Sequence, residues 1–168
     1  MELTLSRGAM VTVDAEEFRA WVTPHLPAMS RLAARLTSDG DRDDVVQDAL
    51  VRAWRRRSTF DPDRGSPQAW LLAIVADRSR RHRVRSAPPS AALVDVAEGP
   101  RADSDRRVDV ERAMRRLARR QRLAVELHYF VGLPIAECAA VMGCSDGTVK
   151  STLSDARRRL RTELEGVR

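Results

Sequence analysis

Aromatic side chains and lysine are scarce in this sequence of 168 residues. Phenylalanine, tryptophan and tyrosine make up 4% of it, against 43% for hydrophobic residues as a whole, and Lys150 is its only lysine. A core must therefore be built from leucine, valine and alanine, and this composition favours helices over a sheet. The basic excess, a net charge of +6 with a pI near 10.7, is carried by arginine.

The arginine excess has two explanations. Arginine binds phosphates and base edges with a planar fork of donors, so an arginine-rich chain favours a polyanionic partner. A GC-rich coding sequence also enriches arginine and alanine, and composition alone leaves this explanation open.

Cysteine is equally sparse, since only Cys138 and Cys144 are present. Two cysteines are too few for a disulfide scaffold and lack the paired spacing of a metal site. We therefore expect both cysteines to be small buried residues of a protein in a reducing cytoplasm. The alternative is that they form a redox-active pair.

Long apolar runs and enzyme motifs are also missing. No run approaches the ~18 residues that a membrane span needs, and the N-terminus has no signal-peptide core, so we expect a cytoplasmic protein without membrane insertion. The three histidines lie in unrelated settings, and no glycine-rich phosphate loop or nucleophile motif appears. We therefore expect no enzyme, no cofactor and no bound metal.

Helical periodicity and helix-breaking residues divide the chain into two all-α blocks. We expect a loose tail over residues 1–13, a helical domain over 14–86, a flexible proline-containing linker over 87–107 and a second helical domain over 108–168. In the first domain Pro24 and Pro27 should interrupt a helix, and Pro67 should begin one. The helix around "VVQDALVRAW" should bury Val46, Leu50, Ala53 and Trp54.

The stretch "MGCSDGTVKSTLSDARRRL" gives the most specific signal. Val149, Leu153, Ala156 and Leu160 recur at helical spacing and form one apolar face, while the opposite face is small, hydrogen-bonding and cationic. Before it, "PIAECAAVM" predicts a helix that ends in a tight turn at Gly143. This order predicts a helix-turn-helix whose second helix enters the DNA major groove. An ordinary helical hairpin is the alternative.

Two charged stretches in the first domain have opposite characters. The run "RSRRHRVR" ends a helix and favours phosphate contact, although a helix C-terminus suits cations in any case. The stretch "DRDDVVQDALVRAW" presents carboxylates that would repel DNA, so its outer face should meet a protein. The alternative interpretation of this stretch is an ordinary solvated helix N-terminus, where aspartate is favoured.

Taken in order, these motifs resemble one protein family. The acidic "DxxQDALVRAW" helix, the "FDPDRGSPQAWLLAIV" segment, a linker and "RQR…V.EL.YF.GL...E.A..MG.S.GTVKS.L..ARRRL" are similar to the extracytoplasmic-function (group IV) class of bacterial sigma factors, in the sigma-70 family. The resemblance covers nearly all of residues 18–164.

The resemblance implies a transcription initiation factor whose partners are core RNA polymerase, promoter DNA and an anti-sigma factor. The first domain would bind the beta-prime clamp helices of the polymerase, and the second would dock on the beta flap. The residues implied for polymerase binding are Asp44, Gln47, Asp48, Arg52 and Trp54. Those implied for the minus-ten element are Ser58, Phe60, Asp61, Asp77, Arg78, Arg81 and Arg85. Those implied for the minus-thirty-five element are Ser145, Gly147, Thr148, Lys150, Ser151, Ser154, Asp155 and Arg158.

Asp77 and Asp155 depart from the family pattern. Relatives often have asparagine at the first position, which both donates and accepts hydrogen bonds, whereas a carboxylate only accepts. Where relatives often have a basic pair, this chain has Ser154 and Asp155, so we expect an unusual minus-thirty-five sequence, in which Asp155 accepts from cytosine.

Two other functions stay open from the sequence. One is a DNA-binding activator that binds its operator without polymerase. The other is a sigma-derived decoy that sequesters an anti-sigma factor, although the intact acidic helix argues against it.

Overall fold

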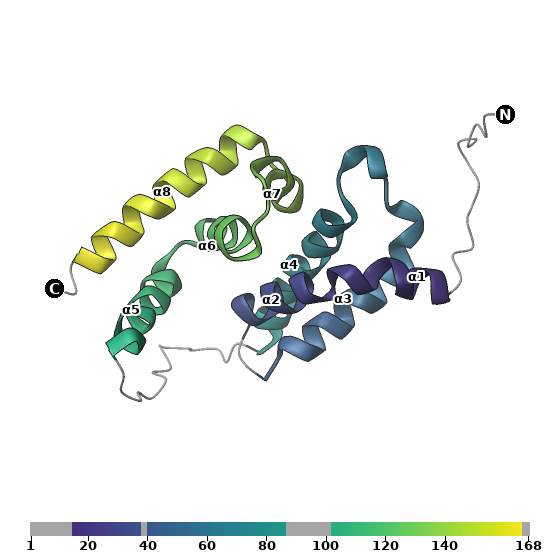
Figure 1. Ribbon diagram of the computed structural model, residues 1–168, viewed down its shortest axis with the longest axis horizontal. Helices are drawn as coiled ribbons and strands as arrows, with labels where there is room; N and C mark the ends of the chain where they lie inside the picture. Colours follow the sequence, from purple (N-terminus) through teal and green to yellow (C-terminus); the bar gives the residue numbers. More distant parts are fainter. Residues whose placement is uncertain (1–14, 38–39, 87–101, 166–168) are drawn as a thin grey trace.

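The structure, a computed structural model, describes residues 15–37, 40–86 and 102–165, and the side chains of all of these except 85–86 and 102–107. Every regular element in these ranges is helical, which confirms the expected all-α fold (Figure 1). Within the same ranges, no helix combines the length and the apolarity needed to cross a bilayer.

Two groups of helices follow each other along the chain. The first block comprises α1 (Ala15–Val22), η1 (Thr23–His25), α2 (Leu26–Leu36), α3 (Arg42–Arg56), η2 (Arg57–Thr59), η3 (Pro62–Arg64) and α4 (Pro67–Ser86). The second block comprises α5 (Ala102–Arg116), α6 (Arg119–Val125), η4 (Glu126–Val131), α7 (Ile135–Met142) and α8 (Asp146–Glu165).

Proline sets the helix boundaries of the first block as expected. Pro24 lies in the 3-10 turn η1 that separates α1 from α2, and Pro67 is the first residue of α4. The Ser66 hydroxyl accepts a hydrogen bond from the Ala69 N–H at 3.1 Å, which satisfies one of the amide donors left free at a helix start.

The buried stripe of α3 differs from the expected one. Its fully buried residues are Val45, Ala49 and Ala53, whereas Val46 and Leu50 are only partly buried at the margin, as is Trp54. Helix α3 packs against both α2 and α4. Small alanine side chains at the centre of the stripe allow these helices to approach closely, and the larger side chains fill the edges.

The second block begins earlier than expected and is more segmented. Helix α5 starts at Ala102, within the segment expected as linker, because the acidic residues of this stretch suit the first turn of a helix. The rest of that segment, 87–101, and the expected tail, 1–13, lie outside the described residues. A break at Leu117 and Ala118 separates α5 from α6, and the chain then passes through the π-helical turn η4 to Gly132.

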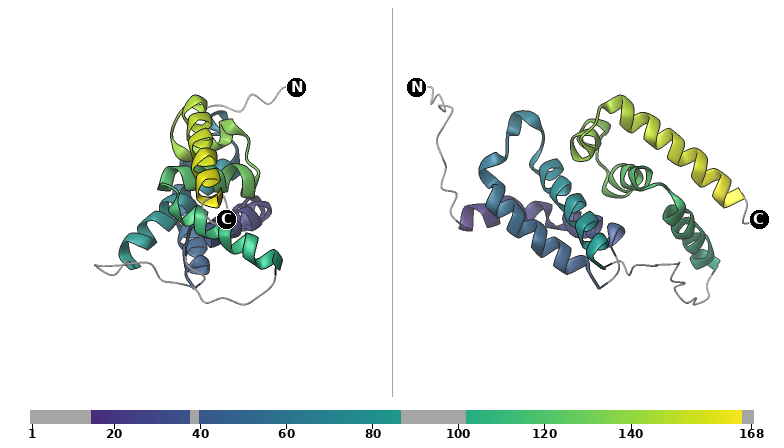
Figure 2. Two further views of the ribbon diagram at one scale, coloured as in Figure 1. Left: turned by 90° about the vertical axis from the view of Figure 1, so that its left-hand side faces the viewer. Right: turned by 180° about the vertical axis from the view of Figure 1, so that it is seen from behind.

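The two blocks pack against each other in the structure. Helix α4 contacts α7, and α2 contacts η4 (Figures 1 and 2). The buried side chains of both blocks form one continuous cluster, from Phe18 in α1 to Ala156 in α8. The expected domain limits at 86 and 108 therefore stay a prediction.

Arg35 on α2 is the main polar link between the blocks. Its Nε donates to Oε2 of Glu126 at 2.8 Å, its Nη1 pairs with Glu111, and its guanidinium lies 4.0 Å from the centre of the Phe130 ring. The Glu126 side chain is 0% exposed. Burial raises the pKa of Glu126, and the hydrogen bond and charge of Arg35, followed by the charge of Arg122, oppose this rise without cancelling it.

Replacing Arg35 with alanine should strongly destabilise the protein, because Glu126 would lose its main counter-ion while staying buried. Breaking a buried ion pair from one side costs about 3–5 kcal/mol of unfolding free energy. The defect should shrink as the pH falls toward the pKa of the unpaired carboxyl, since burial raises that pKa and the protonated form needs no counter-ion. Urea unfolding across a pH series measures both effects.

Arg19→Ala is the matched control, because Arg19 pairs with Glu16 on the surface of α1 and its side chain is 75% exposed. Exposed pairs contribute little to stability. Equal losses of unfolding free energy in the two variants would show that buried Glu126 does not need Arg35 as its counter-ion.

Candidate nucleic-acid interface

The turn between α7 and α8 has the geometry of a helix-turn-helix. Gly143 has φ +62°, in the left-handed region that favours glycine, and the Cys144 N–H donates to the Ala139 carbonyl at 3.1 Å. The Ser145 hydroxyl then accepts from the Thr148 N–H at 3.2 Å and caps α8. The chain therefore stops one helix and starts the next within a few residues, as the sequence predicts.

Because the apolar face of α8 is buried, its polar face points outward. Val149, Leu153 and Ala156 are buried, and α8 packs on α5, α6 and α7. In Figures 1 and 2, α8 lies on the far side of α6 from the first block. The eight residues predicted for the minus-thirty-five element are all exposed: Ser145, Gly147, Thr148, Lys150, Ser151, Ser154, Asp155 and Arg158.

Several side chains on this face interact within α8 itself. The Ser151 hydroxyl donates to the Thr148 carbonyl at 3.0 Å, and Asp155 forms an ion pair with Arg158. Further along, Ser154, Arg157, Arg158 and Arg161 border a shallow cavity of about 350 Å³. The helix thus presents hydroxyl groups at its start and a cationic surface toward its end.

The acidic face of α3 is exposed at three of its five predicted positions. Asp44, Gln47 and Asp48 are exposed, whereas Arg52 is partly buried. Trp54 is also partly buried, and the Arg57 guanidinium lies 3.9 Å from the centre of one of its rings. The exposed acids form a surface that would repel phosphate and can attract a basic partner.

Trp54 and Phe60 belong to an aromatic cluster with Phe18, Trp21 and Trp70. The Phe60 ring centre lies 5.4 Å from that of Trp21 and 5.7 Å from that of Trp70, both with edge-to-face orientation. The cluster gathers most of the few aromatic residues of the chain beside the loop after α3. Phe60 is partly buried, so its ring packs in this cluster while part of it stays accessible.

The loop residues beside this cluster are open to solvent. Ser58 in η2 is exposed, and so is Asp61, whose Oδ1 accepts from the Asp63 N–H at 3.0 Å and starts η3. A side-chain Cβ built at Gly65 would lie 4.0 Å from the Ala140 Cβ of α7. The loop therefore approaches the helix-turn-helix unit at its Gly65 end.

Asp77 on α4 is neutralised by its neighbours. Its carboxylate pairs with Arg80 at 2.7 Å and with Arg81 at 2.9 Å. Partial burial by itself raises the pKa of Asp77, but the hydrogen bonds and charges of the two arginines outweigh it and lower the pKa. Asp77 is thus an ionised carboxylate held by two cations, which reduces its repulsion of phosphate.

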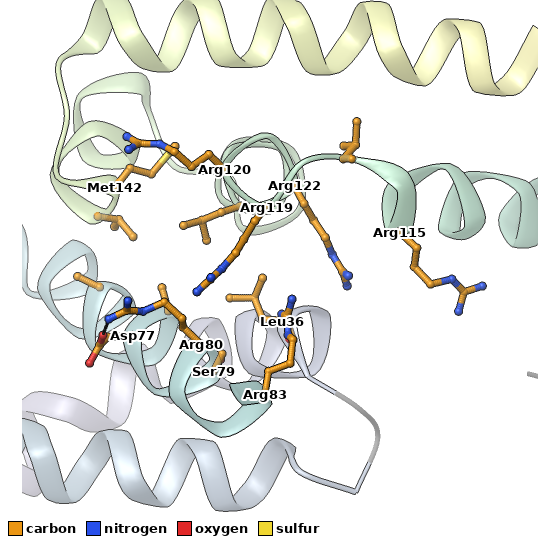
Figure 3. A pocket seen from close by; sticks show the side chains of 15 residues that line it. Leu36, Asp77, Ser79, Arg80, Arg83, Arg115, Arg119, Arg120, Arg122 and Met142 are labelled. Atoms are coloured by element: carbon orange, nitrogen blue, oxygen red, sulfur yellow. Dashed lines mark hydrogen bonds and ion pairs between the residues drawn. The ribbon is translucent and has the colours of Figure 1, made fainter. Parts of the chain in front are cut away.

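The α4 residues predicted for the minus-ten element differ in their exposure to solvent. Arg81 is exposed, whereas Asp77 lines a cavity between α4 and the second block (Figure 3). Arg78 is partly buried, and its Nε has no hydrogen-bond partner within the described residues. The side chain of Arg85 lies outside the described residues.

Sequence reasoning missed the residues that join the two blocks. Arg35 and Glu126 belong to helices that are far apart in the sequence, and only the acidic residue within the apolar run "AVELHYFVG" hinted at a buried charge. His82, beside the arginine run, has its Nε2 3.1 Å from Oδ1 of Asp41, which gives it a protein neighbour.

The two cysteines are not paired with each other. Cys138 is buried, both thiols are free, and burial raises the pKa of Cys138 to about 11. In the described part of the chain, no group of acidic, histidine and cysteine side chains is arranged to hold a metal ion.

Both blocks match families of known proteins. Residues 17–87 match "Sigma-70 region 2", and residues 107–160 match "Sigma-70, region 4". The ECF RNA polymerase sigma factor SigM of Mycobacterium tuberculosis is 39% identical over 163 residues, which cover 91% of this chain and 80% of SigM. SigK of Mycobacterium ulcerans is 36% identical over 146 residues, covering 80% and 78% of the two chains.

Two solved structures share the fold. CnrH in complex with the cytosolic domain of CnrY aligns with a TM-score of 0.69 and 29% identity over 90% of this chain and 89% of CnrH. RpoE of Bartonella quintana, in complex with the anti-sigma factor NepR, aligns with a TM-score of 0.67 and 28% identity over 91% of this chain and 99% of RpoE. Because its curated relatives align over most of both chains and both blocks match sigma-70 regions, this chain belongs to the extracytoplasmic-function (ECF) sigma factors of the sigma-70 family.

Proposed function

We propose that this ECF sigma factor, of group IV, binds core RNA polymerase in the cytoplasm, directs it to specific promoters and assists promoter melting. The observation that carries the proposal is the capped helix α8, whose apolar face is buried while its hydroxyl-rich and basic face is exposed. Residues 14–86 would serve the polymerase and the minus-ten element, and residues 108–168 the minus-thirty-five element.

In this proposal α8 is the recognition helix. The N-terminal residues of a recognition helix meet the base edges, and here they are small or carry hydroxyl groups, which read bases at short range. Lys150 and Arg158 would contact phosphates and set the register on the duplex. Asp155 must exchange its ion pair with Arg158 for a base contact, and cytosine supplies the amino donor that it requires.

The first block would bind the polymerase and the melted strand through different surfaces. The exposed acids Asp44 and Asp48 on α3 suit a basic partner surface such as that proposed on the clamp helices. The loop beside the aromatic cluster would capture an extruded base. Extrusion costs a few kcal/mol of lost stacking, which a partly exposed ring such as Phe60 can replace.

We further propose control by an anti-sigma factor. CnrH and RpoE, which share this fold, were both solved with such a partner or a partner's cytosolic domain. In this chain α7 packs on α4, so the two blocks must separate before α4 can follow an opening duplex. A partner that binds both blocks would control that separation.

Run-off transcription with purified bacterial core polymerase on promoter-library DNA tests the proposed function. We expect sequence-selective transcripts that require this protein. Core binding without transcripts would point to a decoy, and tight operator binding without core would point to an independent DNA-binding regulator.

Reversing the charge of Asp48 should weaken binding to core polymerase by about tenfold, equivalent to about 1.4 kcal/mol, because an exposed acid would face a basic surface as a cation. Glu17→Arg is the control, since Glu17 is an exposed acid on α1, outside the proposed surface. Affinity can be measured by fluorescence anisotropy with labelled protein. Equal losses in Asp48→Arg and Glu17→Arg would refute a specific role for α3.

The Asp155→Arg variant should change promoter choice without reducing stability. The substitution removes a carboxylate acceptor and adds a donor fork, so the preferred base should shift from cytosine toward guanine. Selection from a library randomised in the minus-thirty-five element measures the change. An unchanged consensus would exclude Asp155 from base reading.

A further inference from the structure

A cavity of about 550 Å³ lies between the two blocks (Figure 3). Its walls carry a single carboxylate, Asp77, and six arginines: Arg80, Arg83, Arg115, Arg119, Arg120 and Arg122. Two of the arginines come from α4 in the first block and four from α5 and α6 in the second. The cavity therefore exists in this form only while the blocks are packed together.

Few carboxylates offset the positive charge in this cavity, although Arg83 and Arg122 donate to the Leu36 and Arg35 carbonyls at the end of α2. Asp77 is already shared between Arg80 and Arg81, and Arg122 has only the Glu126 carboxylate nearby, at 3.8 Å. Among the described residues, no carboxylate lies within ion-pair distance of the other four cavity arginines. Like charges held together without counter-ions are unfavourable, so the site favours an incoming anion.

The side chains of the two blocks point toward each other across the cavity. In Figure 3, Arg119 and Arg122 extend from α6 toward Arg80 and Arg83 on α4. Partial burial, followed by the charges of Arg122 and Arg119, lowers the pKa of Arg83. The guanidinium of Arg83 is thus exposed to repulsion from the facing helix, and an anion between them would relieve it.

An unsatisfied hydroxyl lies in the same wall. Ser79 lines the cavity and is 1% exposed, and its Oγ has no hydrogen-bond partner within the described residues. Buried hydroxyl groups are normally hydrogen-bonded, so an unpartnered one needs an explanation. Its Oγ is itself buried, so an anion between the blocks accepts a hydrogen bond from it only after a small local shift of the cavity wall.

We propose that this cavity binds a compact oligophosphate, either inorganic or the phosphate chain of a nucleotide, which bridges the two blocks. Its volume lies within the ~300–1,000 Å³ of small-molecule sites. Arginine forks suit adjacent phosphate groups, since each binds two oxygens in one plane. Because the ligand contacts both blocks, its binding favours the arrangement in which the two blocks are packed together, which we call the closed arrangement. Its consequence for initiation rests on the proposed function, whereas its binding does not.

Calorimetric titration of the full chain with inorganic tripolyphosphate, without polymerase, tests the site. At near-physiological salt we expect saturable binding of one ligand, with sulfate binding at least about tenfold more weakly, since one divalent anion cannot reach both walls. The double variant Arg83→Gln, Arg119→Gln removes one cation from each wall and should weaken tripolyphosphate binding at least about tenfold.

The double variant Arg55→Gln, Arg56→Gln is the matched control, because it removes the same charge from exposed positions at the end of α3. The proposal would be overturned if the two double variants weakened tripolyphosphate binding equally, or if sulfate bound as tightly as tripolyphosphate. Either result would show that the overall positive charge of the protein explains the binding. A Lys150→Gln variant that loses as much affinity as the cavity variant would place the anion on α8 instead, and would also overturn it.

Two further measurements test bridging and the ligand's source. Hydrogen exchange should slow in α4 and in α6 when tripolyphosphate binds, and protection confined to one block would contradict bridging. A nucleoside triphosphate that binds more tightly than tripolyphosphate would identify the ligand as a nucleotide. Equal or weaker binding would identify inorganic oligophosphate. Because these measurements need no transcription, they stand even if the proposed function fails.

Discussion

The contact between the two blocks depends on one buried ion pair, between Arg35 of α2 and Glu126 of η4. A carboxylate that is 0% exposed must have a counter-ion, and Arg35 is the nearest one, at 2.8 Å. Arg122 makes a second polar contact between the blocks, because it donates a hydrogen bond to the Arg35 carbonyl near the C-terminal end of α2. These contacts join the second block to α2, and α7 packs on α4 beside them.

The same ion pair allows the two blocks to separate at little net cost from this pair. The attraction between two buried charges is largely offset by the loss of their hydration, so such a pair determines which groups meet while adding little net stability. If the blocks separate, water restores the hydration of both groups. The ion pair can thus specify how the blocks meet while adding little net stability to a contact that the shared apolar cluster also supports.

Local features of the sequence predicted much of the fold and of the exposed site. Pro24 and Pro67 marked helix boundaries, and Gly143 and the apolar spacing of α8 predicted the turn and the outward face, because each depends on residues within a few positions. The pairing of Arg35 with Glu126 depends on residues 91 positions apart. In a chain with many helical arginines, Arg35 looks like part of a solvated face, and the arginine-lined cavity between the blocks was missed for the same reason.

The near absence of lysine has a structural counterpart in the varied contacts of arginine. Arg35 binds two carboxylates and lies against a ring, Arg83 and Arg122 donate to carbonyls at the end of α2, and Arg57 stacks on Trp54. The contacts of Arg35 and Arg57 use the planar fork or flat face of a guanidinium, which an ammonium group lacks. Part of the basic excess is therefore engaged within the protein. The net charge overstates the cations free to contact DNA, and the exposed face of α8 is a better guide to that contact than composition.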